Sequence, residues 1–441
     1  MSQNLVSDKM QHTVGEWFTK IHFNRKHLLI GMCLFMAFAI ESWEMMILIY
    51  NSGAIAQEFE LSTTQVGSLI SALFLGMIPG ALFWGRLMGQ IGRKKTLILS
   101  LALYGIFPLI SAFSTSYEIL WATRFLCGVV LVGSLVVTFP YFEEIVPVAS
   151  RGKATVYLSS GWPVGVLIAI GITFALEPMG WRVIVGMGAF TSLWAIIIWK
   201  FVPESPYWLA EKNDADGAAQ SITILCNGQF NHPKVILEKQ HSSPSGNLLD
   251  LFKGAVAKTT FLQITINFCF SWGYWAMASW MPLLLSKKGL STPEGLGFLA
   301  ISALFMFPGY ISASYLTGKF GRKKIMVIYV FMAAIAGFAL AKSTNVNELY
   351  FWNFTLSFFS LGAWGVWNTW LGEVYDTRNR GNGTAVGVVS QRVANSIAPI
   401  VIGSILASSS FNFTVAFISM FFILTLIATL FLKETEGVSL K

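Results

Sequence analysis

Away from the ends of the long apolar runs of this 441-residue chain, the only ionisable side chains apart from Cys and Tyr are Glu41, Glu44, Arg124 and Arg392. Glu41 and Glu44 are three residues apart, so on a helix they share one face. Two carboxylates in surroundings of low dielectric do not both ionise easily, and we expect one to be protonated near neutral pH. The pair is therefore a candidate for binding and releasing a proton.

The two arginines need anionic partners, because a guanidinium keeps its proton under physiological conditions. Arg392 lies near the middle of an apolar run, preceded by Gln391 and followed by Asn395 one turn later. Its planar fork suits a carboxylate, which it can grip through two hydrogen bonds. The alternative is a structural role, with Arg392 paired to Glu41 or to backbone carbonyls.

The elements that position these charges are membrane-spanning helices. The chain has 54% apolar and 12% charged residues, with a mean hydropathy of +0.62, which excludes a soluble globular protein. Apolar runs of about 20 residues, the length that crosses a bilayer, form two sets of six. The first set is 28–50, 65–84, 96–114, 119–140, 153–176 and 181–202, and the second is 259–283, 295–317, 324–342, 348–371, 382–406 and 412–432.

This pattern predicts an all-α membrane protein with twelve transmembrane helices in two six-helix bundles. The predicted parts are a cytoplasmic N-terminal segment (1–27), a bundle (28–202), a cytoplasmic linker with short helices (203–258), a second bundle (259–432) and a cytoplasmic tail (433–441). Lys and Arg gather in the loops on the side of the termini, so we expect both termini in the cytoplasm and the protein in the inner, or plasma, membrane. The same clusters account for the net charge of +8 without a nucleic-acid partner.

The two halves repeat each other. The run Gly92-Arg93-Lys94-Lys95 returns as Gly321-Arg322-Lys323-Lys324, an offset of 229 residues. Glu144 and Arg151 return at the same offset as Glu373 and Arg380, which suggests paired structural latches between the repeats. Two parallel repeats in so apolar a chain are typical of membrane transporters.

Motifs that are absent from the sequence narrow the class of protein further. The sequence has no G-x-x-x-x-G-K-[ST] loop for ATP, no nucleophile motif and no cluster of metal ligands. We therefore expect neither an enzyme nor a cofactor or metal, and no disulfide among the four cysteines. Near the N-terminus, Val14, Trp17, Phe18 and Ile21 form either the apolar stripe of an interfacial helix or part of a disordered tail.

These residues resemble the major facilitator superfamily, whose loop between spans 2 and 3 reads G-x-L-x-D-x-x-G-R-K/R. Both copies here keep Gly-Arg-Lys-Lys, but Gly89 and Gly318 replace the usual Asp. Because that Asp normally pairs with an Arg, we expect Glu204 and Glu434 to be the partners of the basic clusters instead.

Further stretches resemble the sugar porter, organic-ion and synaptic-vesicle branch, and in the C-terminal half bacterial niacin transporters. They are 124–128, 144–152, 203–206 and 433–437 for the branch, and 280–282, 307–313 and 356–366 for the niacin group. The resemblance implies that Glu44 pairs with Arg124, and that protonation of Glu44 frees it and permits the change of access. The alternative is a static salt bridge between spans 1 and 4. It also implies that Arg392 holds an organic anion.

In this superfamily spans 1, 4, 7 and 10 line the cavity, which singles out some aromatic residues. Tyr274 and Trp275 lie in span 7, and Trp364, Trp367 and Trp370 form a slowly turning ridge in span 10. We expect a ring-shaped substrate to stack there while Asn368 bonds a heteroatom, with Trp162 as a weaker candidate from the other half. For any single Trp the alternative is plain packing.

The sequence thus predicts a secondary transporter that imports a small organic anion, nicotinate or a similar carboxylate, with a proton by alternating access. The alternatives are symport of a sugar, a polyol or a carboxylate-rich chelate, efflux of an amphipathic compound, or a receptor that kept the fold without transport. A lone Gln263 in span 7, where sugar porters have paired glutamines, argues against a hexose.

Overall fold

The computed structural model describes residues 11–230, 233–237 and 248–435. Residues 1–10 of the N-terminal segment, 238–247 of the linker and 436–441 of the tail lie outside this description. The first bundle consists of α2 (Arg25–Glu58), α3 (Thr63–Ile91), α4 (Arg93–Tyr104) with α5 (Ile106–Ala112), α6 (Tyr117–Ile145), α7 (Arg151–Ser159) with α8 (Gly161–Leu176), and α9 (Trp181–Gly186) with η3 (Met187–Ser192) and α10 (Leu193–Phe201). The second consists of α13 (Gly254–Lys287), α14 (Thr292–Phe320), α15 (Arg322–Lys342), α16 (Val346–Glu373), α17 (Thr377–Ser408) and α18 (Phe411–Leu430).

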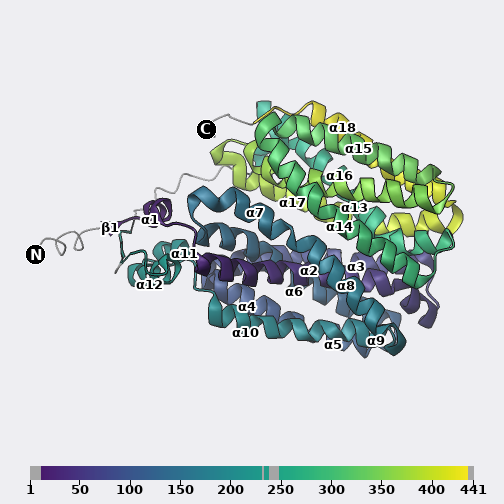
Figure 1. Cartoon of the computed structure of the whole chain (residues 1–441), viewed down its shortest axis with the longest axis horizontal. Coiled ribbons are helices and arrows are strands. Elements are labelled where there is room, and N and C mark those ends of the chain that lie inside the picture. Colours follow the sequence, from purple (N-terminus) through teal and green to yellow (C-terminus); the bar gives the residue numbers. More distant parts are fainter. Residues whose placement is uncertain (1–10, 231–232, 238–247, 436–441) are drawn as a thin grey trace, which may run out of the picture.

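These helices confirm the predicted all-α fold. Within the described residues, ten of the spans are long and apolar enough to cross a membrane. The other two, α13 and α16, are 34 and 28 residues long and pack among them. Figure 1 shows all of them running roughly parallel to the long axis of the molecule.

Glycines at equivalent positions turn the chain in both halves. Gly92 ends α3 and starts α4 with φ 99°, and Gly321 ends α14 and starts α15 with φ 96°. Residues that carry a Cβ rarely adopt such positive φ values, whereas Gly adopts them readily. The Gly of the repeated Gly-Arg-Lys-Lys run is therefore required by the backbone of the turn.

Each half contains an equivalent pair of helices that cross at very short range. A Cβ built on Gly80 of α3 would lie 2.4 Å from the carbonyl oxygen of Val129 on α6. At the offset of 229, a Cβ on Gly309 of α14 would lie 2.3 Å from the carbonyl oxygen of Phe358 on α16. Small residues of this kind let helix backbones approach closely inside a membrane.

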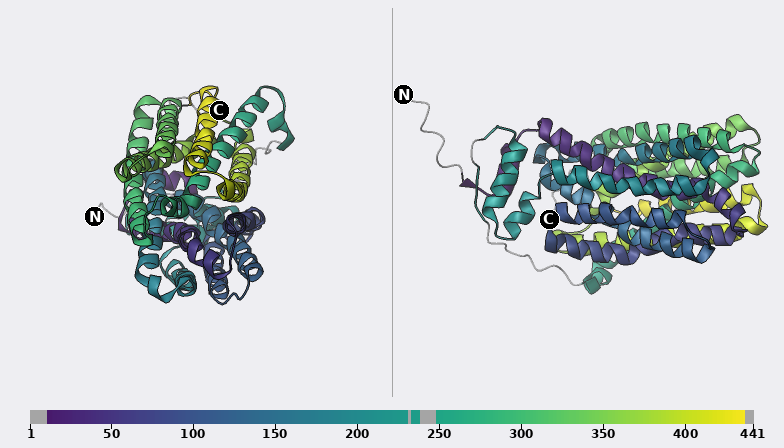
Figure 2. Two further views of the ribbon diagram at one scale, coloured as in Figure 1. Left: turned by 90° about the vertical axis from the view of Figure 1, so that its right-hand side faces the viewer. Right: turned by 90° about the horizontal axis from the view of Figure 1, so that it is seen from below.

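The two bundles lie side by side and join most closely where α3 meets α17 (Figure 2). A Cβ on Gly67 would lie 2.3 Å from the carbonyl oxygen of Pro399, and one on Gly403 would lie 2.5 Å from that of Thr63. These contacts are at the start of α3 and the end of α17, which is the end of the bundles farthest from the linker. The halves are therefore held together at that end.

A separate layer covers the other end of the N-terminal bundle (Figure 2). It contains α1 (Val14–Lys20), α11 (Pro206–Glu211), α12 (Ala215–Cys226) and a two-residue parallel pairing of β1 (Gln11–His12) with β2 (Lys234–Val235). Short 3-10 turns complete the chain at Val148–Ser150, Glu177–Met179 and Leu248–Phe252.

The N-terminal helix corrects the prediction of an interfacial helix or a disordered tail. Trp17 and Phe18 are fully buried, and Trp17 Nε1 donates to the backbone oxygen of Lys234, 3.0 Å away. Phe18 packs on Tyr207 of α11. The apolar stripe is present, but it packs against the linker and not against lipid. Other apolar side chains remove it from water just as effectively as a lipid surface would.

Candidate functional site

Glu44 is completely buried on α2 and accepts a hydrogen bond from the hydroxyl of Tyr104 on α4. Arg124 of α6, also completely buried, donates from Nη2 to the backbone oxygen of Glu44, 3.3 Å away. Among the described residues no salt bridge joins the two side chains. This corrects the predicted carboxylate–guanidinium pair: Tyr104 holds the carboxylate, and Arg124 reaches the main chain behind it.

The space around Glu44 is tight but its hydrogen bonding is incomplete. A Cβ on Gly188 of η3 would lie 2.5 Å from Glu44 Oε1, so the carboxylate is enclosed from that side too. In the described part of the chain, Glu44 Oε1 and the Nε and Nη1 atoms of Arg124 have no hydrogen-bond partner. Buried polar groups are normally paired, so a carboxyl group and a guanidinium that are both left partly unpaired are suited to change partners.

Arg392 lies at the interface between the halves. Its Nη1 is 3.5 Å from Met77 Sδ of α3, in the opposite bundle, and it is near enough to the buried Glu41 to interact electrostatically. Nevertheless, Glu41 Oε2 and Arg392 Nε lack partners among the described residues. The guanidinium therefore keeps hydrogen-bonding capacity for an anion.

At the same interface, aromatic rings from both halves meet. Trp162 Nε1 of α8 donates to the Tyr274 hydroxyl of α13 at 2.9 Å. Trp275 packs edge-on against Trp162 at 5.6 Å and against Phe74 of α3 at 4.6 Å, while Trp364 of α16 lies 5.6 Å from Tyr274. The four predicted residues Trp162, Tyr274, Trp275 and Trp364 thus form one aromatic wall between the bundles.

The predicted ridge on α16 does not extend beyond Trp364. Trp367 and Trp370 are completely buried and pack on each other at 5.9 Å, and Asn368 is exposed rather than beside the wall. The reason is helical geometry: a spacing of three advances 300° per step instead of a full turn, so the ridge rotates away from the interface. The prediction that these three residues share one substrate surface is wrong.

Gln391 and Asn395 belong to networks inside the C-terminal half. Gln391 Nε2 and Trp367 Nε1 both donate to Asn267 Oδ1, at 2.6 and 2.9 Å. With its amide oriented to satisfy both neighbours, Asn395 accepts from Trp275 Nε1 at 3.1 Å and donates to the Gln391 backbone oxygen at 2.9 Å. Asn395 therefore supports the aromatic wall from behind, and Gln391 fixes α17 to α13.

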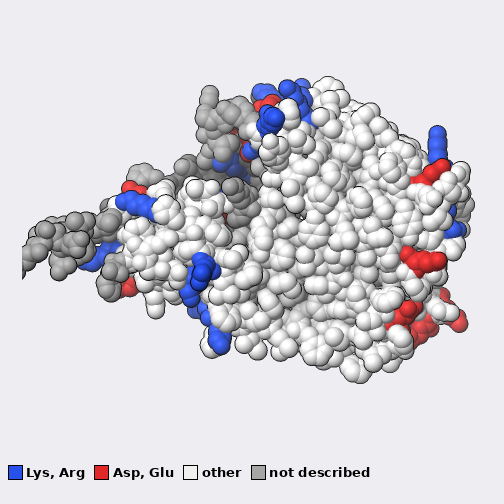
Figure 3. Space-filling view, viewed as in Figure 1, with Lys and Arg blue, Asp and Glu red and all other residues white. Residues whose placement is uncertain are grey.

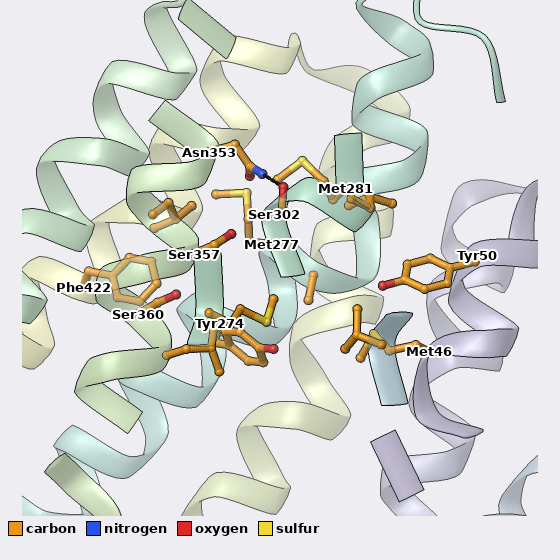
Figure 4. Close-up of a pocket in the computed structure, with 16 residues that line it drawn as sticks. Met46, Tyr50, Tyr274, Met277, Met281, Ser302, Asn353, Ser357, Ser360 and Phe422 are labelled. Atoms are coloured by element: carbon orange, nitrogen blue, oxygen red, sulfur yellow. Dashed lines mark hydrogen bonds between the residues drawn. The ribbon is translucent and has the colours of Figure 1, made fainter. Parts of the chain in front are cut away.

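Next to the wall is a small cavity between the bundles, and of the predicted substrate residues it is lined only by Tyr274. Figure 4 shows the hydroxyl groups of Tyr50 and Tyr274 directed into it from opposite sides. The sixteen lining residues are Met46, Tyr50, Val166, Tyr274, Met277, Ala278, Met281, Leu299, Ser302, Met306, Asn353, Leu356, Ser357, Ser360, Leu361 and Phe422.

The predicted latches are present at the linker end, but they form within each half. Arg93 binds Glu144 through Nε at 2.9 Å and Nη2 at 2.8 Å, and Arg322 binds Glu373 in the same way at 3.2 and 3.1 Å. The spacing suggested that Glu144 pairs with Arg151 and Glu373 with Arg380. The structure pairs these two acids with Arg93 and Arg322 instead. Arg151 instead donates to the Tyr207 hydroxyl at 3.0 Å.

Glu204 and Glu434 meet the basic runs through the backbone. Glu204 accepts from the amides of Arg93 and Lys94 at 2.9 and 3.1 Å, and Glu434 accepts from those of Arg322 and Lys323 at 2.9 and 3.1 Å. A carboxylate at a helix N-terminus satisfies free amides and the helix dipole together. These two acids supply the N-terminal caps that Gly92 and Gly321, which have no side chain, cannot provide.

Sequence reasoning missed several residues of the site. Tyr104 and Met77 give no signal of their own, because a Tyr or Met in an apolar run is ordinary. Asn267 was detectable, since it follows Gln263 by four residues and both amides therefore share a face of α13. Ser302 and Asn353 lie 51 residues apart and only the fold brings them into contact.

Two six-helix bundles that bury acids and arginines around their interface, beside a cavity, define a multi-pass membrane transporter. The chain belongs to the major facilitator superfamily: that family's model matches residues 28–341 and 299–440. It is a secondary transporter and not an enzyme.

Known relatives span nearly the whole chain. A niacin transporter of Acinetobacter baylyi, NiaP, is 28% identical over 88% of this chain and 89% of its own length. The 3-(3-hydroxy-phenyl)propionate transporter of Escherichia coli is 25% identical over 87% and 88%. The inward open structure of the xylose transporter XylE from E. coli superposes with a TM-score of 0.74 at 17% identity, covering 94% of this chain and 98% of that one, which shows a shared fold.

Proposed function

We propose that this protein imports a small aromatic carboxylate, nicotinate or a close analogue, together with a proton. The observation that carries the proposal is Arg392, whose guanidinium has free hydrogen-bonding capacity at the interface of the bundles, where the aromatic wall also lies. A carboxylate would bind the guanidinium fork while its ring packs on Trp275 or Trp364.

The relatives support the same class of substrate. Two of the relatives are named as transporters of niacin and of 3-(3-hydroxy-phenyl)propionate. Each of these compounds combines one ring with one carboxylate. One structural neighbour is described as a proton:xylose symporter, which supports proton coupling as a mechanism of the fold.

For coupling, we assign the proton to Glu44. When ionised, Glu44 attracts the partly unpaired Arg124; when protonated it loses this attraction and keeps the bond with Tyr104 and the Arg124 bond to its backbone oxygen. Protonation therefore weakens the tie between α2 and α6 and favours rocking of the bundles. Glu41 acts as a counter-ion of Arg392 and is displaced when the substrate carboxylate arrives.

We further propose that the protein lies in the plasma membrane with its linker end facing the cytoplasm. Figure 3 shows Lys and Arg gathered at that end, an uncharged belt around the middle and mainly acidic side chains at the other end. Basic residues concentrate on the cytoplasmic side of membrane proteins.

The test is uptake of labelled nicotinate into proteoliposomes with an inward proton gradient. We expect accumulation by the wild type, loss of nicotinate binding in Arg392→Gln, and at least about tenfold weaker accumulation but persistent counterflow exchange in Glu44→Gln. Arg86→Gln, which changes an exposed arginine of α3, is the matched control. Normal binding in Arg392→Gln would refute the anion site, and gradient-driven accumulation by Glu44→Gln would refute the coupling role. Uptake of xylose, a polyol or a citrate-type chelate instead of nicotinate would replace the substrate class.

A further inference from the structure

A groove opens on the outer face of the N-terminal bundle, between α4 and α10. Figure 1 shows these two helices side by side at the edge of the bundle opposite the C-terminal half. Three of its lining side chains are exposed, and all but one are apolar, so in a membrane the groove faces the hydrocarbon chains of lipids. The lining residues are Ile98, Ala102, Ser192, Ala195, Ile196 and Trp199.

The end of the groove deeper in the membrane is closed by direct contact of the two helices. Ser192 Oγ donates to the backbone oxygen of Ala102 at 3.1 Å, and a Cβ built on Gly105 would lie only 2.0 Å from Ser192 Oγ. From this contact toward the linker end, seven residues back along α4 lead to Lys95, and eight residues forward along α10 lead to Lys200. At 1.5 Å per residue the two lysines therefore lie at one level, roughly 10–12 Å from the closed end.

The open end of the groove thus carries two cations. Lys95 and Lys200 are both exposed, and among the described residues no ion pair gives either of them an acidic partner. Trp199 is exposed beside Lys200, and Trp and Lys side chains near the end of a span are typical of the level of the lipid head groups. An apolar groove that ends in two lysines at this level is complementary to a lipid with a negatively charged head group.

These features are not shared by the other half of the repeat. At the offset of 229, two small residues of the lining are replaced by phenylalanines, and one of the two cations is replaced by a buried hydroxyl. The correspondences are Ala102 to Phe331, Ser192 to Phe421 and Lys200 to Thr429. Large side chains take up the space that small ones leave open. The repeated fold therefore does not require either the groove or its pair of lysines.

We propose that this groove binds a phospholipid with a net negative charge from the leaflet at the linker end. One acyl chain lies along the groove, and the head-group phosphate accepts hydrogen bonds from Lys95 and Lys200. The bound lipid joins α10, the last helix of the bundle, to α4, and so stabilises the folded N-terminal half. The proposal depends on the membrane-spanning fold and not on the identity of the transported substrate.

The test is native mass spectrometry of the full-length protein, purified in detergent and titrated with phosphatidylglycerol or with phosphatidylcholine of the same acyl chains. We expect one phosphatidylglycerol to bind at least about tenfold more tightly than phosphatidylcholine. The double variant Lys95→Gln/Lys200→Gln should lose this preference, because each lysine near an anionic head group contributes roughly fivefold in affinity. Ala102→Phe, which introduces the residue type of the other half, should fill the groove and weaken the binding of both lipids.

The matched control is Lys319→Gln/Lys324→Gln, which removes the same charge from exposed lysines at the linker end of the C-terminal half. It should bind phosphatidylglycerol as the wild type does. The proposal is overturned if the wild type shows no preference for phosphatidylglycerol, if the two double variants lose affinity equally, or if Ala102→Phe binds this lipid normally.

Glycerol phosphate separates the head group from the chain, because it carries the charge without acyl groups. It should not displace phosphatidylglycerol at equal concentration, and displacement would overturn the role of the groove. Thermal unfolding of each variant without added lipid shows whether it is folded. Since the lysines and Ala102 are changed separately, the loss of one variant to misfolding leaves the other to decide.

Discussion

At their linker ends, the two halves of this transporter make the same contacts one by one. Arg93 and Glu144 correspond to Arg322 and Glu373, and a hydroxyl joins each acid, from Ser205 in the first half and from Thr435 at 2.7 Å in the second. The glycine crossings are also duplicated. The interior is different: at the offset of 229, Asn267 of the amide network corresponds to Phe38, and Arg124 corresponds to Asn353.

This difference separates two kinds of task. Rocking of two bundles needs hinges, caps and close crossings that behave alike on both sides, so both copies retain them. Binding and coupling need different chemistry on each side of the interface. The N-terminal half accordingly holds Glu41, Glu44 and Arg124, and the C-terminal half holds amides, hydroxyls and Arg392.

The largest expected effect comes from the duplicated crossings. Gly80→Val and Gly309→Val each force a side chain into a backbone oxygen of the facing helix, which we expect to cost roughly 3 kcal/mol or more and to remove most folded protein. The yield of monodisperse protein in size-exclusion chromatography is the measurement. Gly89→Ala and Gly318→Ala are the controls, because nothing lies within 4 Å of either added Cβ. Tolerance of one crossing variant and loss of the other would break the equivalence of the halves.

A smaller effect, confined to one half, should follow removal of the amide at the centre of the C-terminal network. Asn267→Leu leaves the buried N–H groups of Gln391 and Trp367 without an acceptor, at an expected cost of about 3 kcal/mol. Adding Trp367→Phe removes one of those donors and should restore roughly 1 kcal/mol. Thermal unfolding followed by intrinsic fluorescence measures both. A double variant no more stable than Asn267→Leu would show that the Trp367 bond contributes nothing.

The smallest effect is expected at the latches, whose side chains are 14–21% exposed. Arg93→Ala and Arg322→Ala should each lower stability by about 1 kcal/mol, since partial exposure to water screens the charges. The sharper observation is equality: melting temperatures of the two variants should agree within error. A much larger loss of stability in Arg93→Ala would mean that the layer formed by α1, α11 and α12 over the N-terminal bundle depends on the latch.

The amino-acid sequence predicted the fold well because its signals are local. Apolar runs located the twelve spans, and Gly92 and Gly321 marked the turns within the repeat. Charge rarity inside those runs singled out Glu44 and Arg124, which the structure buries inside the N-terminal bundle, and Arg392, which it places at the interface of the two bundles. Glu204 and Glu434 were predicted as partners of the basic runs because Gly89 and Gly318 replace the usual loop Asp, and both acids do bind those runs.

The sequence by itself therefore determined the helices, the repeat and the inventory of buried charges, because each depends on residue type along a short stretch. Only the tertiary structure decided which side chains meet. Tyr104 reaches Glu44 across 60 residues and Trp367 reaches Asn267 across 100, whereas Trp370 turns away from a surface that its spacing seemed to share. Helical periodicity gives the faces of each helix relative to one another, but the rotation of that helix against its neighbours is set by packing of the whole bundle.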